Sequence, residues 1–433
     1  MYRKHFHKTH RQVFSIKKWK MRTLFWSFAI LVGVVAALFA LGSNVADHFF
    51  RYLYQNHIVL AYLLPPVGLA LIAWLTQNVF KGTEGSGIPQ AIAALSMKNN
   101  IARNSVLSLK LAAGKILLTC LGLFSGASIG REGPTVHVGA SIMYSLRHFR
   151  YFRGQKMVKS LILAGGAAGI SAAFNTPLAG IIFAIEEMSR SFEEKTSSTL
   201  LIVVVLAGLT ALLILDEYTY FGSTSATLPF SSAWIAVILL GVVGGILGGI
   251  FSTILIYGTK KIAPAIKQHP MIVAFTCGVL ISIIGYLSNG QTFGTGYLEA
   301  KNLVTGGEAD PAFPFYKFLA TVVSYLSGIP GGIFAPSLSI GAGFGSVMAE
   351  FIPNSTSSAI VILGMVGYFT GVVQTPITAF VIVMEMTDNS GMLMPLMATA
   401  LIARSVSRVV CPIPIYEAMA QLYIKKVKEI EKT

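Results

Sequence analysis

Long stretches of the chain carry no charged residue, and short polar segments separate them. The stretches without Asp, Glu, Lys or Arg are 23–46, 52–80, 196–215, 218–259, 268–298, 318–349 and 351–384. One helical membrane crossing takes about 20 apolar residues, so the pattern predicts about ten to fourteen membrane segments. We expect helices, because the alternation typical of barrel strands is absent and a membrane-spanning chain must satisfy its backbone polar groups internally.

Proline and glycine interrupt many of these apolar runs near their middle. The interruptions are Pro65-Pro66, Gly87-Ile88-Pro89, Gly133-Pro134, Asn175-Thr176-Pro177, Gly328-Ile329-Pro330-Gly331-Gly332, Ala335-Pro336 and Thr375-Pro376. Non-helical backbone at membrane depth is tolerated only where it is buried in protein or lines a polar cavity. The pattern therefore predicts half-helices that end inside the membrane, as in transporters that build their sites at such ends.

Two distant parts of the chain repeat one spacing of proline and acid. Glu186 stands nine positions after Pro177, and Glu385 stands nine positions after Pro376. Because similar residues surround both pairs, we interpret them as a diverged internal repeat. The expected fold class is an all-α polytopic membrane protein, with an inverted internal repeat of two entwined halves and many broken or half-spanning helices.

A polar loop at 216–233 separates the two halves, and each half has a Gly/Pro-rich break that opens an apolar helix. These breaks are at 85–89 and 331–336. The expected organisation is a basic arm or helix at 1–22 and one transport domain at 23–433, with its first half at about 23–220, its second half at about 230–420 and a short basic tail at 421–433.

Composition agrees with a membrane protein. Charged residues make up 12% of the chain and apolar residues 54%, and the mean hydropathy is +0.68. A soluble protein has about 25% charged residues. Cys120, Cys277 and Cys411 stand alone inside apolar segments, so they are interpreted as core residues. We expect no disulfide, no metal site and no cofactor.

The net charge of +15 reflects where the basic residues lie. Residues 1–22 contain eight basic side chains and no acid, and 421–433 is rich in lysine. The positive-inside rule therefore predicts that both termini are cytoplasmic. We interpret the arm as a topology signal attracted to anionic lipid headgroups, rather than as a nucleic-acid site.

Glu132 is a carboxylate within an apolar region, at a glycine-flanked helix start. An acid inside the membrane is costly and is by default a functional candidate. A helix that starts inside the membrane also directs free N–H groups at an anion. From chemistry alone, a structural role for Glu132, as a carboxylate at a helix N-terminus or in a salt bridge with Arg131, has the same weight as a functional role.

Four short motifs stand in a fixed order along most of the chain. They are Gly85-Ser86-Gly87-Ile88-Pro89, Gly130-Arg131-Glu132-Gly133-Pro134, Gly331-Gly332-Ile333-Phe334-Ala335-Pro336 and the late Tyr416. In this order they closely resemble the CLC family, the voltage-gated chloride channel family of chloride channels and chloride/proton antiporters.

The resemblance implies an anion site and a gate. The anion would be coordinated by the hydroxyls of Ser86 and Tyr416 and by the backbone N–H groups of Ile333 and Phe334. Glu132 would be the external gate, which competes with the anion when ionised and carries a proton when it swings away. The supporting residues implied by the resemblance are Gly85, Gly87, Pro89, Lys115, Arg131, Gly133, Pro134, Gly332 and Glu186.

The paired acids Glu186 and Glu187 bear on the choice between channel and antiporter. Antiporters of the family retain a second glutamate on the cytoplasmic side, which implies Glu187 as the internal proton acceptor and Glu186 as its structural neighbour. Without the resemblance, the pair is equally well explained as interfacial acids balanced by Arg190 and Lys195.

Lys115 matches a buried lysine of the family that shapes the potential of the anion site. The nearby Lys110 leaves this register open. A snorkelling side chain at Lys115 is the alternative.

The function expected from the resemblance is chloride/proton antiport, with a passive voltage- or pH-gated chloride channel as the alternative. Ser86 with Tyr416 favours chloride over bromide and nitrate. Chloride, protons and membrane lipid are the expected partners, in a homodimer with one pathway per subunit in a bacterial inner membrane. We expect no enzymatic activity: Gly126-Ala127-Ser128-Ile129-Gly130 fits a serine-hydrolase elbow, but it is read as part of an apolar helix.

Overall fold

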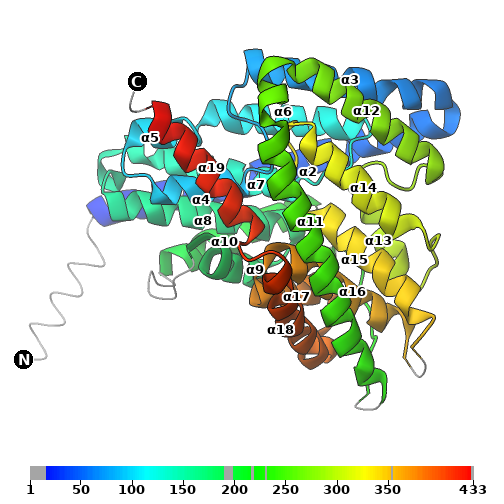
Figure 1. Ribbon diagram of the computed structural model, residues 1–433. Helices are drawn as coiled ribbons and strands as arrows, with labels where there is room; N and C mark the ends of the chain where they lie inside the picture. The colour runs from blue at the N-terminus through cyan, green and yellow to red at the C-terminus, as the bar shows by residue number, and fades with distance from the viewer. Residues whose placement is uncertain (1–15, 190–197, 216–218, 230–231, 353–354, 431–433) are drawn as a thin grey trace, which may run out of the picture.

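The computed structural model describes residues 16–189, 198–215, 219–229, 232–352 and 355–430, which fold almost entirely into helices (Figure 1). The part of the chain so described contains two isolated backbone bridges and no strand. Ten longer helices have these bounds: α2 Ile16–Asn56, α3 Ile58–Asn78, α6 Leu109–Phe124, α8 Gln155–Phe174, α10 Ser198–Leu215, α11 Ile235–Gln268, α12 Pro270–Leu287, α16 Ser357–Val373, α18 Leu393–Val410 and α19 Ile415–Ile430.

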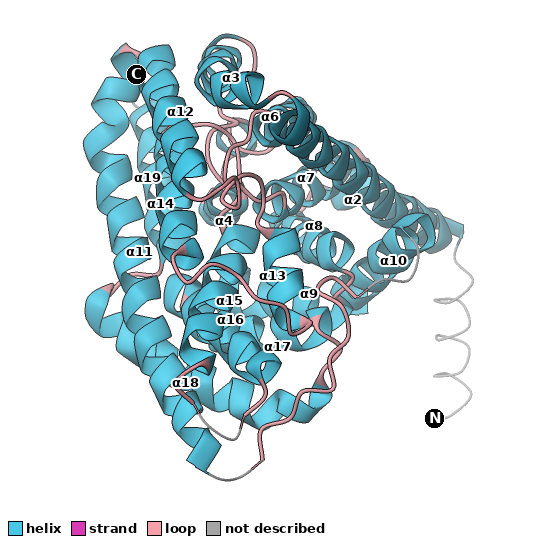
Figure 2. Ribbon diagram, turned by 90° about the vertical axis from the view of Figure 1, so that its right-hand side faces the viewer, coloured by secondary structure: helices cyan, strands magenta, loops and turns pink. Residues whose placement is uncertain are grey.

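Shorter helices lie among the long ones. They are α4 Ile88–Ser96, α5 Asn100–Asn104, α7 Glu132–Ser145, α9 Pro177–Phe183, α13 Tyr297–Val304, α14 Phe313–Leu326, α15 Phe334–Ala349 and α17 Pro376–Met386, with a π-helical turn at Ala184–Ser189 and 3-10 turns at Leu146–His148, Arg150–Phe152, Ser232–Trp234 and Ser390–Met392. Figure 2 shows loop segments gathered among the helices near α4 and α7.

The helices fit a membrane. In the described residues, seven helical stretches are long and apolar enough to cross it, and four more are apolar but only 10–17 residues long. The chain is therefore an integral membrane protein in which full crossings are mixed with shorter helices. This is the all-helical fold with half-spanning segments that the sequence predicts.

Two expectations about local structure are corrected. Pro65 and Pro66 do not break a helix, because both lie inside α3. Ser128 lies in the loop after α6 rather than in a helix, and its hydroxyl is 3.0 Å from that of Thr321. The expected tail at 421–433 is described as far as residue 430, and this part continues α19. Of the expected arm at 1–22, residues 16–22 begin α2, and 1–15 lie outside the described residues.

The other interruptions do begin new helices. Asn175 and Gln374 end α8 and α16 in the left-handed conformation, with φ of 57° and 61°. Pro177 and Pro376 then start α9 and α17, where proline's fixed φ and missing N–H are tolerated. In both halves, a residue in the left-handed conformation ends one helix and a proline starts the next. This shared arrangement supports the internal repeat.

The two halves also exchange helix caps. The Glu186 carboxylate accepts hydrogen bonds from the backbone N–H groups of Ile377 and Thr378, at 3.2 and 2.6 Å. The Glu385 carboxylate accepts those of Leu178 and Ala179, at 3.2 and 2.7 Å. Glu186 therefore lies at the N-terminus of α17, the helix that contains Glu385, and Glu385 lies at the N-terminus of α9, the helix before Glu186. A negative charge is favourable at both places.

This exchange makes a first prediction. Glu385→Ala leaves the N–H groups at the start of α9 without their carboxylate, so we expect a loss of about 1–2 kcal/mol in stability. The measurement is the thermal unfolding midpoint in detergent, with the exposed Glu350→Ala as control. Equal midpoints for the two variants would contradict the capping role.

The structure changes how the Gly/Pro-rich breaks correspond. The sequence analysis matched 85–89 with 331–336, but Gly130 and Gly332 exchange two backbone hydrogen bonds of 2.7 Å each. Buried lysines stand fifteen positions before both glycines, at Lys115 and Lys317. The 130–134 motif is thus the counterpart of the 331–336 motif, and the two lie face to face.

Candidate functional site

Glu132 is the first residue of α7 and is completely buried. Its Oε2 accepts a hydrogen bond from the backbone N–H of Ala335, at 3.4 Å, in the first turn of α15. Its Oε1 accepts one from the hydroxyl of Tyr220, at 3.3 Å. The carboxylate therefore lies against the N-terminus of a second helix, at a place suited to an anion.

Ser86 and Tyr416 each bury a hydroxyl. Ser86 precedes α4, and Tyr416 lies in the first turn of α19. The two hydroxyls are close to each other, and Tyr416 is within electrostatic range of Glu132 and Glu187. Neither hydroxyl has a partner with hydrogen-bonding geometry among the described residues. A buried polar group without a partner is costly, so these hydroxyls fit a site that binds an anion.

Ile333 and Phe334 are the N-cap and first residue of α15, and both are buried. The first N–H groups of a helix have no carbonyl partner inside it. The Phe334 ring packs against Phe369, with ring centroids 4.2 Å apart, which holds this helix start in place. The structure thus brings four of the expected elements together: Glu132, the start of α15, Ser86 and Tyr416.

Two backbone bridges assemble this centre. The Gly130–Gly332 pair joins the start of α7 to the start of α15. Gly85 pairs with the loop at 329–331, donating to the carbonyl of Ile329 and accepting from the N–H of Gly331. The loop that carries Ser86 is thereby fixed beside the two helix starts.

Gly133 lets the Ser86 loop approach α7. A Cβ at Gly133 would overlap the Ser86 hydroxyl and lie 2.8 Å from the Ser86 carbonyl oxygen. Gly87 has a φ of 104°, which residues other than glycine rarely adopt. Pro89 and Pro134 lie in the first turns of α4 and α7. These residues shape the backbone around the hydroxyl.

This packing makes a second prediction. Gly133→Ala should displace Ser86 and weaken chloride binding at least tenfold, because no space exists for the methyl group. Calorimetric titration of the purified protein with chloride measures it. Gly154→Ala is the control, since a Cβ there meets nothing within 4 Å. Unchanged chloride binding in Gly133→Ala would show that this contact does not form the site.

Lys115 is fully buried, so it does not snorkel, whereas Lys110 is exposed. The Nζ of Lys115 donates to the carbonyl oxygens of Gly85, at 2.6 Å, and Glu84, at 3.3 Å. The lysine therefore holds the Ser86 loop through the backbone of that loop.

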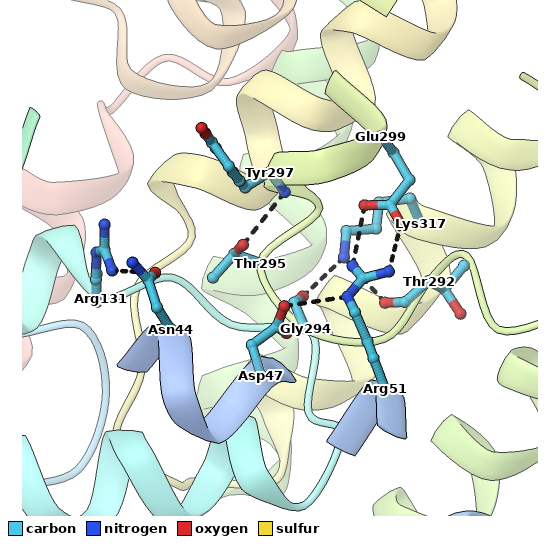
Figure 3. Close-up of polar contacts among 10 residues, drawn as sticks. All are labelled: Asn44, Asp47, Arg51, Arg131, Thr292, Gly294, Thr295, Tyr297, Glu299 and Lys317. Carbon is cyan, nitrogen blue, oxygen red and sulfur yellow. Dashed lines mark hydrogen bonds and ion pairs between the residues drawn. The ribbon is translucent and has the colours of Figure 1, made fainter. Parts of the chain in front are cut away.

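Lys317 likewise holds a loop through its backbone in the second half, and it was not predicted from the sequence. Its Nζ donates to the carbonyl oxygens of Thr292 and Gly294, at 2.9 and 2.8 Å (Figure 3). The equal spacing of Lys115 and Lys317 from Gly130 and Gly332 was the signal that could have found it.

Glu187 lies in the π-helical turn that follows α9 and is 1% exposed. Glu132 and Glu187 are the only buried acids in the described parts of the chain. Glu186, in the same turn, is partly exposed and caps α17. π-Helical turns occur frequently at functional sites. Arg190 and Lys195, the alternative partners of these acids, lie outside the described residues.

Two cavities border this centre. One, of about 540 Å³, is lined by Gly85 next to Ser86, and by Glu84 and Lys426, which form an ion pair of 3.1 Å. The other, of about 200 Å³, is lined by Arg131 and Tyr220, the chain neighbour and the contact of Glu132. Ser86 and Glu132 do not line these cavities themselves, and each has a neighbour that lines a different one.

Arg131 turns its guanidinium toward α2. It donates to the carbonyl oxygen of Ala40, at 2.7 Å. It also donates to Asn44 Oδ1, at 2.7 Å (Figure 3). Asp47 lines the same cavity and forms an ion pair with Arg51, which also pairs with Glu299 of α13. The smaller cavity therefore has a polar wall that ties α2 to α13.

The chain is similar to several known proteins. The family described as "Voltage gated chloride channel" matches residues 68–408. Proteins named H(+)/Cl(-) exchange transporter ClcA, from Yersinia pestis and Yersinia pseudotuberculosis, are 30% identical over 415 residues, which cover 90% of this chain and 82% of theirs.

Solved structures are also similar. A slow cyanobacterial Cl−/H+ antiporter is 27% identical with a TM-score of 0.81, covering 93% of this chain and 98% of its own. A eukaryotic CLC transporter, at 21% identity, has a TM-score of 0.75 and covers 93% of this chain and 74% of its own. The latter likeness is one of fold.

Proposed function

Because the chain belongs to the CLC family of voltage-gated chloride channels and antiporters, we propose that it exchanges chloride for protons in opposite directions across a membrane. The observation that carries the proposal is the position of Glu132, a titratable carboxylate where helix α15 offers its N-terminus. The relatives named as H(+)/Cl(-) exchangers and the cyanobacterial antiporter support exchange over a passive channel.

The proposed site couples the two ions through competition. When Glu132 is ionised, its carboxylate occupies the place of the anion at the start of α15. When Glu132 is protonated, it loses its charge and leaves, and chloride is then held by the hydroxyls of Ser86 and Tyr416 and the N–H groups of Ile333 and Phe334. Hydroxyls and amides bind an anion without a full positive charge, so release remains fast enough for turnover.

The proposed proton route continues to Glu187. Its burial keeps it from free exchange with water, and Tyr416 is within electrostatic range of both Glu187 and Glu132. A passive channel has no need of a second buried acid, so Glu187 supports antiport. Lys115 and Arg131 would supply the positive potential around the anion, and Gly85, Gly87, Pro89, Gly133, Pro134 and Gly332 the backbone shape.

The finer features are part of the proposal. Residues 23–433 would form one transport domain, with halves at about 23–220 and 230–420, in a homodimer with one pathway per subunit. The basic residues at both ends of the sequence support cytoplasmic termini in a bacterial inner membrane. Chloride, protons and lipid are the proposed partners, without enzymatic activity.

Vesicles that contain only the purified protein test the function. An imposed chloride gradient, with the membrane voltage held at zero, should drive protons uphill in the opposite direction. Chloride flux without proton movement across a range of pH would instead support the passive channel. No flux of either ion would reject both.

A further inference from the structure

We propose that Tyr220 is part of the gate: its hydroxyl holds the Glu132 carboxylate in the anion pathway and thereby sets how well chloride competes for the site. The inference rests on the proposed function of Glu132. Tyr220 belongs to none of the four motifs and comes from the polar loop between the two halves. It is thus a positioning residue that acts through the gate.

The Glu132 carboxylate is held at both oxygens. Tyr220 donates its hydroxyl to Oε1 at 3.3 Å, and Ala335 donates its backbone N–H to Oε2 at 3.4 Å. The backbone donor belongs to the anion site itself and would be open to chloride once the carboxylate leaves. The Tyr220 hydroxyl therefore stabilises the position in which the Glu132 carboxylate, rather than chloride, occupies the site.

Aromatic packing fixes the Tyr220 ring in this orientation. Its centroid lies 4.9–5.2 Å from those of Phe174, Phe221 and Tyr297, in edge-to-face geometry. The side chain is only 2% exposed. The backbone N–H of Phe221 donates to the carbonyl oxygen of Met386, at 2.9 Å, which anchors the loop to α17. The hydroxyl is thus presented to Glu132 at little further cost in conformational entropy.

Phe174 links this cluster to the anion site. Its ring lies 5.2 Å from that of Tyr220 and 5.2 Å from that of Phe334, at the start of α15. Tyr220 also lines the 200 Å³ cavity together with Arg131. Its hydroxyl therefore stands between that cavity and the gating carboxylate.

The bond depends on the charge of Glu132. A hydroxyl binds a carboxylate more strongly than a neutral acid, because the charge assists the hydrogen bond. The other groups that influence Glu132 are Arg131 on its own helix start and the Tyr416 hydroxyl from α19. Tyr220→Phe leaves these groups unchanged and removes one oxygen atom.

The test is chloride exchange by reconstituted Tyr220→Phe. At neutral pH, we expect the half-saturating chloride concentration to fall about tenfold, the size expected for a hydrogen bond to a charged group. Proton coupling should persist, because Glu132 still titrates. In acid, where Glu132 is protonated and has left, the difference from the wild type should disappear. An unchanged chloride dependence at every pH would overturn the proposal.

Testing the same substitution in the Glu132→Gln variant separates a gating role of Tyr220 from a merely structural one. In Glu132→Gln, where no carboxylate forms, adding Tyr220→Phe should change the chloride dependence less than twofold. The same tenfold change in that background would overturn the proposal. Tyr297→Phe is the matched control, because its ring packs in the same cluster and lines the same cavity.

Failure of the role of Tyr220 can be distinguished from failure of the proposed function. Uphill proton movement by the wild type is measured in the same preparation. Its failure rejects the proposed function, whereas normal exchange with an insensitive Tyr220→Phe rejects only the role of Tyr220.

Discussion

Glu132→Gln should abolish proton movement, leaving chloride flux that no longer depends on pH. The amide keeps the size of the side chain but cannot titrate, so it can neither carry a proton nor compete as an anion. The loss of proton flux should exceed about a hundredfold, since the buried carboxylate is the proposed shared element of both pathways. The measurement is chloride and proton flux from the same vesicles between pH 4 and pH 8.

The exposed Glu350→Gln serves as the control and should behave as the wild type. Proton pumping that survives in Glu132→Gln would show that another group carries the proton. Chloride flux that keeps the pH dependence of the wild type would show that the gate lies elsewhere.

Glu187→Gln should stop proton transport while chloride continues to flow. Glu187 is proposed to take protons between Glu132 and the opposite side of the membrane, and it has no proposed contact with the anion. We expect proton flux to fall at least about a hundredfold, the lower end of the range for losing a positioned proton-transfer group, and chloride flux to change less than about twofold. Flux measurements in the vesicles used for Glu132→Gln provide both values.

Glu186→Gln is the matched control, because Glu186 is the preceding residue of the same π-helical turn. Its carboxylate bonds the backbone N–H groups of Ile377 and Thr378. We expect it to lower the thermal midpoint and to leave proton coupling intact. Equal losses of proton flux in both variants would assign the effect to disruption of the turn rather than to Glu187.

The fold was predictable from the sequence to the extent that the membrane imposes simple rules. Charge-free runs identify the helices, and the spacing of Pro177 and Glu186, repeated at Pro376 and Glu385, reveals the repeat. The prolines themselves were less informative. Pro65 and Pro66 lie within α3, whereas Pro177 and Pro376 begin helices, because the preceding Asn175 and Gln374 turn the chain by adopting the left-handed conformation.

The candidate site was predictable where short motifs carry it. Glu132 and Ser86 stand in such motifs, and the structure brings both together with Tyr416. Glu187 and Lys115, outside the four motifs, were named only through the resemblance to the family, and Tyr220 and Lys317 were not found. Tyr220 reaches Glu132 only through the folding of a loop 88 positions away in the chain. The π-helical turn at Glu187 also has no sequence signal, because such turns are set by packing between helices.

The central claim is that one carboxylate couples chloride and protons, and the ratio of the two fluxes tests it most directly. Chloride and proton movement can be recorded together from wild-type vesicles under gradients of either ion. We expect the same ratio whichever ion drives the other, with Glu132→Gln reducing the proton flux to background. A ratio that changes with the driving gradient, or proton movement that only follows the membrane voltage, would contradict it.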